Sequence, residues 1–156
     1  MLDPDRRAFI EGRRTATLAT ISKAGLPRLV PICFVLADEV SGSALPVLYS
    51  PLDEKPKRSA DVHDLARVRD IIDRPMATLL FERWDEDWTR LAWVRATGTA
   101  SIVEPGERPT AHRRLAAAMR DKYPQYRDQS IETSPMIRVV LEKVTAWSAE
   151  AGWHGS

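Results

Sequence analysis

The residues with the clearest chemical potential lie between positions 49 and 58, in the stretch Tyr-Ser-Pro-Leu-Asp-Glu-Lys-Pro-Lys-Arg. Lys55, Lys57 and Arg58 place three cations in a short loop between a predicted strand and a predicted helix. Lysine and arginine bind phosphate oxygens, and the start of the following helix adds backbone donors and a favourable dipole. The loop therefore predicts a phosphate site, although a solvated basic loop has the same composition and is the commoner case.

Other catalytic patterns are absent from the sequence. His63, His112 and His154 lie on two predicted helices and near the end of the chain, without the spacing of metal ligands. There is no Gly-x-Ser-x-Gly elbow, Walker loop or Rossmann glycine pattern. If the protein is an enzyme, we therefore expect a bound cofactor, rather than a side chain, to carry out the main chemical step. No catalytic side chain is identified, although Tyr126 and Arg127 are conceivable donors near the end of a helix.

Length and charge narrow the class of protein. The 156 residues suit one domain, 1–156, and the 23 basic and 22 acidic residues give a net charge of +1. This balance gives no general attraction to nucleic acid or to an anionic membrane. The start of the chain is charged, and there is no run of 18 apolar residues, so we expect neither a signal peptide nor a membrane span. A reduced, cytoplasmic setting is the expectation.

The elements that must position the cationic loop are mostly strands. Helices are predicted over 4–14, 61–73 and 109–122, and strands over 15–22, 28–37, 45–50, 76–83, 91–103 and 136–149. Pro31 restricts the second strand to a sheet edge or a bulge, and Gly98 indicates a bulge or tight bend. Val62, Leu65, Val68 and Ile72 are the predicted apolar face of the second helix. About six strands with few helices predict a mainly β, closed or split barrel with helices at its rim.

Several stretches of the sequence together resemble a known protein family. The stretches that carry the resemblance are Glu54-Lys-Pro-Lys-Arg58, Arg74-Pro75, Ala77-Thr-Leu-Leu-Phe81, Asp85-Glu-Asp-Trp88, Trp93-Val-Arg-Ala-Thr-Gly-Thr-Ala100 and Tyr123-Pro-Gln-Tyr126, with 16–27 and 30–32 before them. Together they resemble the pyridoxamine-phosphate-oxidase-like split-barrel proteins, over about 14–148. The likeness is strongest to the branch that uses the deazaflavin coenzyme F420.

The resemblance implies a fold, a cofactor and a set of binding residues. It implies a homodimer of six-stranded barrels of the FMN-binding split-barrel type, with the cofactor, F420 or FMN, at the dimer interface and a small organic molecule as substrate. The residues that it assigns to the cofactor fall into three groups. The phosphate would be held by Lys57, Lys55 and Arg58, and the tricyclic ring would lie along Val30, Pro31, Ile32 and Cys33. The strand that leads to the phosphate loop would end at Tyr49 and Ser50. Trp88 would approach the cofactor from the partner subunit.

Two alternatives stay open from the sequence. A split barrel can bind a flavin and only store or carry it, and a small nucleic-acid-binding barrel is disfavoured by the balanced charge. Pyridoxamine phosphate oxidase proper has a longer C-terminal substrate segment with Arg and His, which this chain lacks, so vitamin B6 oxidation is not expected. We interpret the lone Cys33 as a buried packing residue rather than a redox site. The five tryptophans are interpreted as core or interface anchors rather than stacking platforms. The acidic stretch 85–87 is interpreted as an exposed turn rather than a metal site.

Overall fold

A computed structural model of the chain describes residues 2–38, 45–52, 61–150 and 152–153. The helices are α1 (Pro4–Glu11), α2 (Ala66–Asp73) and α3 (Pro109–Lys122), with single 3-10 turns η1 (Val62–Asp64), η2 (Trp88–Arg90), η3 (Pro124–Asp128) and η4 (Ile131–Thr133). The strands are β1 (Ala16–Ile21), β2 (Pro27–Ile32), β3 (Val35–Asp38), β4 (Pro46–Pro51), β5 (Met76–Arg83), β6 (Ala92–Val103), β7 (Met136–Val140) and β8 (Lys143–Ser148).

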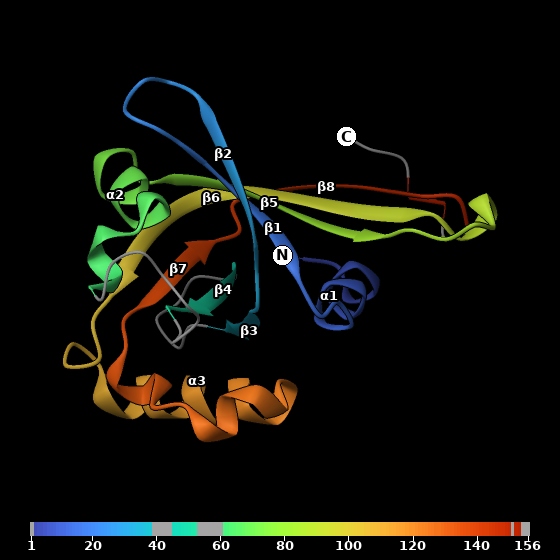
Figure 1. Ribbon diagram of the computed structural model, residues 1–156. Helices are drawn as coiled ribbons and strands as arrows, with labels where there is room; N and C mark the ends of the chain where they lie inside the picture. The colour runs from blue at the N-terminus through green and yellow to red at the C-terminus, as the bar shows by residue number, and fades with distance from the viewer. Residues whose placement is uncertain (1, 39–44, 53–60, 151, 154–156) are drawn as a thin grey trace.

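The strands form an open antiparallel sheet that curls around a core (Figure 1). Its order is β2-β1-β5-β6-β7-β4-β3, and β8 pairs with β6 beside this path. The 12-residue β6 belongs to both halves of the barrel, since it pairs with β5 and β8 in one half and with β7 in the other. The predicted mainly β split barrel with helices at its rim is thereby confirmed, but with eight strands instead of six.

One additional strand arises because the predicted strand 28–37 divides into β2 and β3. The backbone of Phe34, between them, pairs with a side chain instead of a neighbouring strand. The Phe34 N–H donates to the Tyr123 hydroxyl at 2.9 Å, and that hydroxyl donates to the Phe34 carbonyl oxygen at 2.9 Å. A buried backbone group needs a hydrogen-bond partner, and the partner of the Phe34 backbone is the Tyr123 side chain rather than a neighbouring strand. Pro31 lies on β2, which pairs only with β1 among the described strands, so the predicted edge position is confirmed.

The other additional strand arises because the predicted strand 136–149 turns a corner after β7. Gly98 on β6 lies directly under this corner, where a Cβ atom would meet the Val140 carbonyl oxygen at 1.6 Å. The N–H of Glu142 donates to the Thr97 carbonyl oxygen at 3.1 Å, which holds the corner against β6. Glycine at position 98 thus permits β6 to exchange its partner from β8 to β7.

Two predicted helices are shorter than expected. The first ends at Glu11 rather than at residue 14, and Asp3 caps its start by accepting from the N–H groups of Asp5 and Arg6. The second does not begin as an α-helix at 61, because Leu65 has extended backbone angles between η1 and α2. Its buried face uses Val68 and Ile71, while Ile72 is 64% exposed, so the predicted place of Ile72 on the apolar face is wrong.

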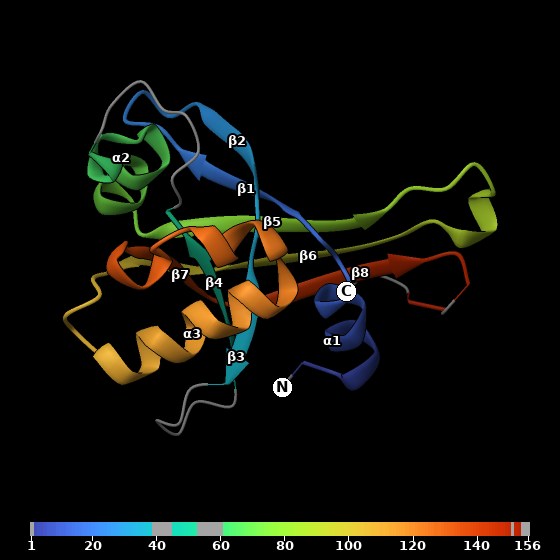
Figure 2. The ribbon, with the colours of Figure 1, turned by 60° about the horizontal axis from the view of Figure 1, so that its bottom comes forward.

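The apolar side chains gather in two clusters. The larger fills the barrel between the sheet and α1 and α2, and includes Ile10, Leu18, Phe34 and Phe81. The smaller lies between α3 and the strands β3, β4 and β7, and includes Met119. Figure 2 shows α3 lying across the sheet beside β4 and β3. Among the described residues, no helix has the length and apolar composition needed to cross a membrane.

Candidate functional site

The predicted ring-binding segment lies on the edge strand β2 and at its end. Val30 is half-buried, Ile32 is buried, and both pack with the barrel core. Pro31, between them, is exposed and lies opposite Thr17 of β1, while Leu29 is 65% exposed. Because successive side chains of a strand point to opposite faces, β2 presents an apolar strip of Leu29 and Pro31 to the outside and inserts Val30 and Ile32 into the core.

The register of β3 on β4 brings this segment to the predicted phosphate loop. Val35 lies opposite Tyr49 in the antiparallel pair. The residues just before β3, Cys33 and Phe34, therefore lie beside the end of β4 at Ser50 and Pro51. The chain then enters the loop that carries Lys55, Lys57 and Arg58, which lie outside the described residues. The ring-binding segment thus lies beside the point, after Pro51 and Leu52, where the chain leaves β4.

Tyr49 and Ser50 are both buried but on opposite sides of β4. Tyr49 belongs to the cluster beneath α3, with 7% of its surface exposed. Ser50 is 3% exposed and alternates with it, on the side of Leu48 and the barrel core. Of this pair, Ser50 is the residue on the barrel side of the strand.

Trp88 does not lie near the other predicted site residues within one chain. It begins η2, at the tip of the long β5–β6 hairpin, and is 69% exposed. Figure 1 shows this tip projecting away from α2 and from the junction of β2 and β3. Asp87 accepts from the N–H and the hydroxyl of Thr89, so the acidic stretch 85–87 shapes the turn at the tip.

A buried carboxylate fastens α2 to the first hairpin. Asp70 is 5% exposed, and its Oδ2 accepts from Thr20 Oγ1 on β1 and from Arg28 Nε on β2, each at 2.8 Å. A buried charge needs such partners to offset its lost hydration. The helix that follows the cationic loop is therefore fixed to the hairpin that carries the ring-binding segment. Sequence analysis overlooked Asp70; its place between the apolar Val68 and Ile71 on one helix face was the available signal.

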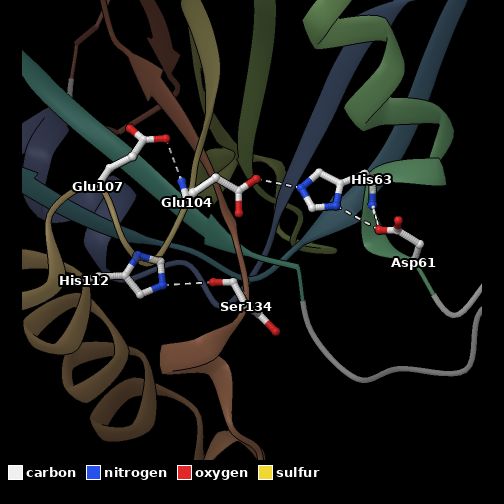
Figure 3. A network of polar contacts seen from close by, with 6 residues as sticks. All are labelled: Asp61, His63, Glu104, Glu107, His112 and Ser134. Carbon is white, nitrogen blue, oxygen red and sulfur yellow. Dashed lines mark hydrogen bonds and ion pairs between the residues drawn. The ribbon is translucent and has the colours of Figure 1, made fainter.

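His63 joins the end of the cationic loop to the turn after β6 (Figure 3). Its Nδ1 contacts Asp61 Oδ1 at 2.8 Å and its Nε2 contacts Glu104 Oε1 at 2.6 Å. The hydrogen bond with Glu104, followed by that with Asp61, raises the pKa of His63 above 6.5. Both ring nitrogens are thus directed at carboxylates. This arrangement indicates a structural role for His63 on the surface rather than a role as a phosphate ligand.

The metal interpretation of the acidic residues receives no geometric support. Among the residues that the structure describes, no group of three or more His, Cys, Asp or Glu side chains is placed to share an ion. His112 is 3% exposed and its Nε2 lies 2.9 Å from the Ser134 carbonyl oxygen, which ties α3 to the segment before β7 (Figure 3).

Comparison with known proteins gives one family and a set of similar folds. Residues 2–148 match the family described as pyridoxamine 5'-phosphate oxidase. A conserved hypothetical protein, Rv2991 of Mycobacterium tuberculosis, is 21% identical, with a TM-score of 0.70 over 96% of this chain and 86% of that one. A FAD-binding protein of Mesorhizobium loti is 13% identical (TM-score 0.64, 93% and 94% covered).

A third similar structure is the heme storage protein HutZ of Vibrio cholerae, at 15% identity and a TM-score of 0.61, with 94% of each chain covered. At these identities the solved structures establish likeness of fold. A comparison with curated proteins gives no match.

Proposed function

The chain belongs to the pyridoxamine 5'-phosphate oxidase family, and from this premise we propose that it binds a flavin-type cofactor and uses it as an oxidoreductase on a small organic substrate. The deazaflavin F420 is favoured and FMN is the alternative, because the stretches 54–58, 85–88 and 93–100 resemble the deazaflavin-dependent branch.

The observation that carries the proposal is the position of the predicted ring-binding segment beside the end of β4, from which the chain continues toward the cationic residues. The register of β3 on β4 sets Cys33 and Phe34 beside the entry to the cationic loop. A flavin-type cofactor needs these two environments at neighbouring places, since its ring is apolar and its phosphate is anionic. The exposed apolar strip of Leu29 and Pro31 suits a ring, and Pro31 has no N–H group that the ring would leave unsatisfied.

In this proposal each group of residues has one task. Lys57 binds the phosphate, with Lys55 and Arg58 as further cations, and the segment Val30–Cys33 orients the ring. Ser50 is buried on the barrel side of β4, the strand that leads into the loop. When bound, the cofactor supplies hydride transfer, and the chain anchors its phosphate and leaves one ring face open to a substrate.

We further propose that the chain forms a homodimer through the outer face of β1, β2, β5, β6 and β8. Along β5 and β6 the inward side chains are buried, while outward ones such as Leu80 and Trp93 are half-buried. Trp93 lies opposite Trp147 on this face, and Leu29 and Met76 are 65% and 61% exposed. Figures 1 and 2 show α1 and α3 on the inner side of these strands.

A second copy is the occupant that best suits this face. Its apolar side chains, such as Leu80 and Trp93, share the face with polar ones such as Arg95, and such a mixture of apolar and polar groups is usual where two folded chains pack together. A two-fold pair would also give a role to Trp88, which projects away from its own ring-binding segment and could reach that of the partner.

A side-by-side titration of the purified cofactor-free protein with F420 and with FMN tests the proposal. Saturable binding of F420 alone places the chain with the deazaflavin reductases, and binding of FMN alone places it with the flavin enzymes. If the reduced cofactor binds but is oxidised by no acceptor in a broad screen, the protein is a carrier and the oxidoreductase proposal fails. Binding of neither cofactor contradicts the whole proposal.

A further inference from the structure

A pocket lies beside the junction of β2 and β3, on the side of the turn that follows α3. Its volume is about 300 Å³, within the lower range of small-molecule sites. The lining comprises Arg14, Thr15, Cys33, Tyr123, Gln125, Tyr126 and Gln129. Aromatic rings, side-chain amides and a cation thus surround a space large enough for one small planar molecule.

One cation, Arg14, lines this pocket, and a second, Lys122, lies beside it against the lining Tyr123; neither forms an ion pair among the described residues. The guanidinium carbon of Arg14 lies 4.9 Å from the Tyr123 ring centroid. Lys122 stands between two rings, with its Nζ 3.8 Å from the Phe34 centroid and 5.4 Å from the Tyr123 centroid. Glu11 acts on Lys122 from a distance but is itself paired with Arg7 at 2.9 Å. The positive charge at this pocket is therefore not neutralised by the described part of the chain.

The pKa of Lys122 is consistent with this shortage of negative charge. Burial first, and then the neighbouring Arg14, lower it from 10.5 to about 8. A lysine next to a carboxylate would show the opposite shift. Cys33 and Glu11 act in the opposite direction but do not offset the burial of Lys122.

The walls of the pocket are held in place before any ligand binds. The Tyr123 hydroxyl is fixed by the backbone of Phe34. Arg120 donates to the carbonyl oxygens of Tyr126 at 3.1 Å and of Gln129 at 2.8 Å, and also pairs with Glu132. Tyr123 and Tyr126 meet edge to face, with ring centroids 5.7 Å apart. A preformed wall reduces the entropy that a ligand must lose on binding.

We propose that this pocket binds a small aromatic carboxylate, with the carboxylate directed to Arg14, the ring packed against Tyr123 and Tyr126, and Lys122 adding positive charge from beside the pocket. The charge selects an anion, and the aromatic walls select a planar apolar body over a bare inorganic ion. The site stands on described residues alone and does not depend on the cofactor. Cys33 belongs both to this pocket and to the proposed ring-binding segment, so a bound acid would lie close to that segment.

Benzoate is the probe that tests the pocket, by isothermal titration of the cofactor-free protein near pH 7. We expect saturable 1:1 binding of benzoate, with binding of the neutral isostere benzamide and of acetate at least about tenfold weaker, because the first lacks the charge and the second lacks the ring. This comparison uses only the wild-type chain, so it does not depend on any variant folding. Equal binding of benzoate and benzamide, or no saturable binding of benzoate at millimolar concentration, overturns the proposal.

Variants then locate the site. Arg14→Gln and Lys122→Met each remove one charge while keeping much of the side-chain volume, and each should weaken benzoate binding by about tenfold. Arg114→Gln, which removes a cation from the exposed face of the same helix α3, should leave it unchanged. If all three variants bind benzoate like the wild type, the acid binds elsewhere and the assignment to this pocket is wrong. Because no cofactor is present, these outcomes are independent of the F420 and FMN titrations.

Discussion

The hydroxyl of Tyr123 bonds to both backbone groups of Phe34, accepting from its N–H and donating to its carbonyl oxygen, each at 2.9 Å. The two residues are 89 positions apart in the sequence. This contact replaces the strand pairing that Phe34 would otherwise need, and it fixes the end of the ring-binding segment to the end of α3. Burial raises the pKa of Tyr123 to about 12, so its hydroxyl stays protonated and can keep donating at neutral pH.

Tyr123→Phe should lower the free energy of unfolding by about 2–3 kcal/mol, because it leaves a buried N–H and a buried carbonyl without their partner. Urea denaturation followed by circular dichroism measures the change. Thr133→Val removes a hydroxyl that donates to a backbone oxygen at an exposed site, and it should cost less than about 1 kcal/mol. Similar losses for the two variants would contradict a special role for the Tyr123 hydroxyl.

Asp70→Ala should destabilise the fold by about 2–3 kcal/mol, since it removes the acceptor shared by Thr20 and Arg28 and leaves the buried hydroxyl unsatisfied. Arg28 is 46% exposed and can return to water, which keeps the cost below that of a fully buried pair. Asp73→Ala, on the exposed side of the same helix, is the control and should change stability by less than about 0.5 kcal/mol. A loss no larger than that of the control would show that Asp70 does not fasten α2.

His63 should give the fold a pH-dependent contribution. Its pKa in the folded chain is raised above the ordinary 6.5, chiefly by the hydrogen bond with Glu104. The contribution is therefore fully present below pH 6.5 and is lost as the pH rises through the folded-state pKa. The difference in unfolding free energy between the wild type and His63→Gln should be larger at about pH 5.5 than at about pH 9. A difference that is constant with pH would contradict a charged link between Asp61, His63 and Glu104.

Lys57→Ala should weaken binding of the cofactor by about 1–3 kcal/mol, the usual loss for a charge-assisted hydrogen bond to phosphate. The measurement is the dissociation constant of whichever cofactor the wild type binds, F420 or FMN. Lys23→Ala removes the same charge from the turn between β1 and β2 and should bind like the wild type. If Lys57→Ala also binds like the wild type, the phosphate lies elsewhere.

Leu29→Glu should convert the proposed dimer into monomers, because it replaces an exposed apolar side chain of the outer face by a charge where the partner would pack. Leu29 is 65% exposed in a single chain, so the substitution should leave the fold of that chain intact. Light scattering at micromolar concentration gives the mass, and Ala117→Glu, on the exposed face of α3, should remain dimeric. A monomeric wild type would refute the dimer directly.

Much of the fold could be predicted from the sequence because it depends on local patterns. The bounds of β5 and α3, at Met76–Arg83 and Pro109–Lys122, agree with the predicted ranges. Pro75, which ends the helix before β5, and Pro109, which starts α3, act on neighbouring residues, so no distant contact is needed to interpret them. Pro31 restricted its strand to a sheet edge or a bulge, since proline has no N–H to offer a second neighbour, and the structure has β2 at the edge.

The candidate site was only partly predictable. The apolar segment Val30–Cys33 was predicted from family resemblance, but its position beside the end of β4 depends on the register of Val35 against Tyr49. Asp70 was overlooked because its partner Thr20 is 50 positions away. Trp88 was predicted to approach the cofactor from the partner subunit, and its place at the far tip of the β5–β6 hairpin leaves that a prediction.

The sequence by itself determined a mainly β chain with a cationic loop after its β4 segment, because side-chain periodicity and turn residues act over a few positions. Only the tertiary structure decided where two strands divide, which carboxylate fastens α2, and that Cys33 lies in a pocket with Arg14 and Tyr123. These features depend on partners such as Phe34 and Tyr123, or Gly98 and Val140, that are far apart in the chain. Such pairs meet only when the barrel closes, so no local pattern records them.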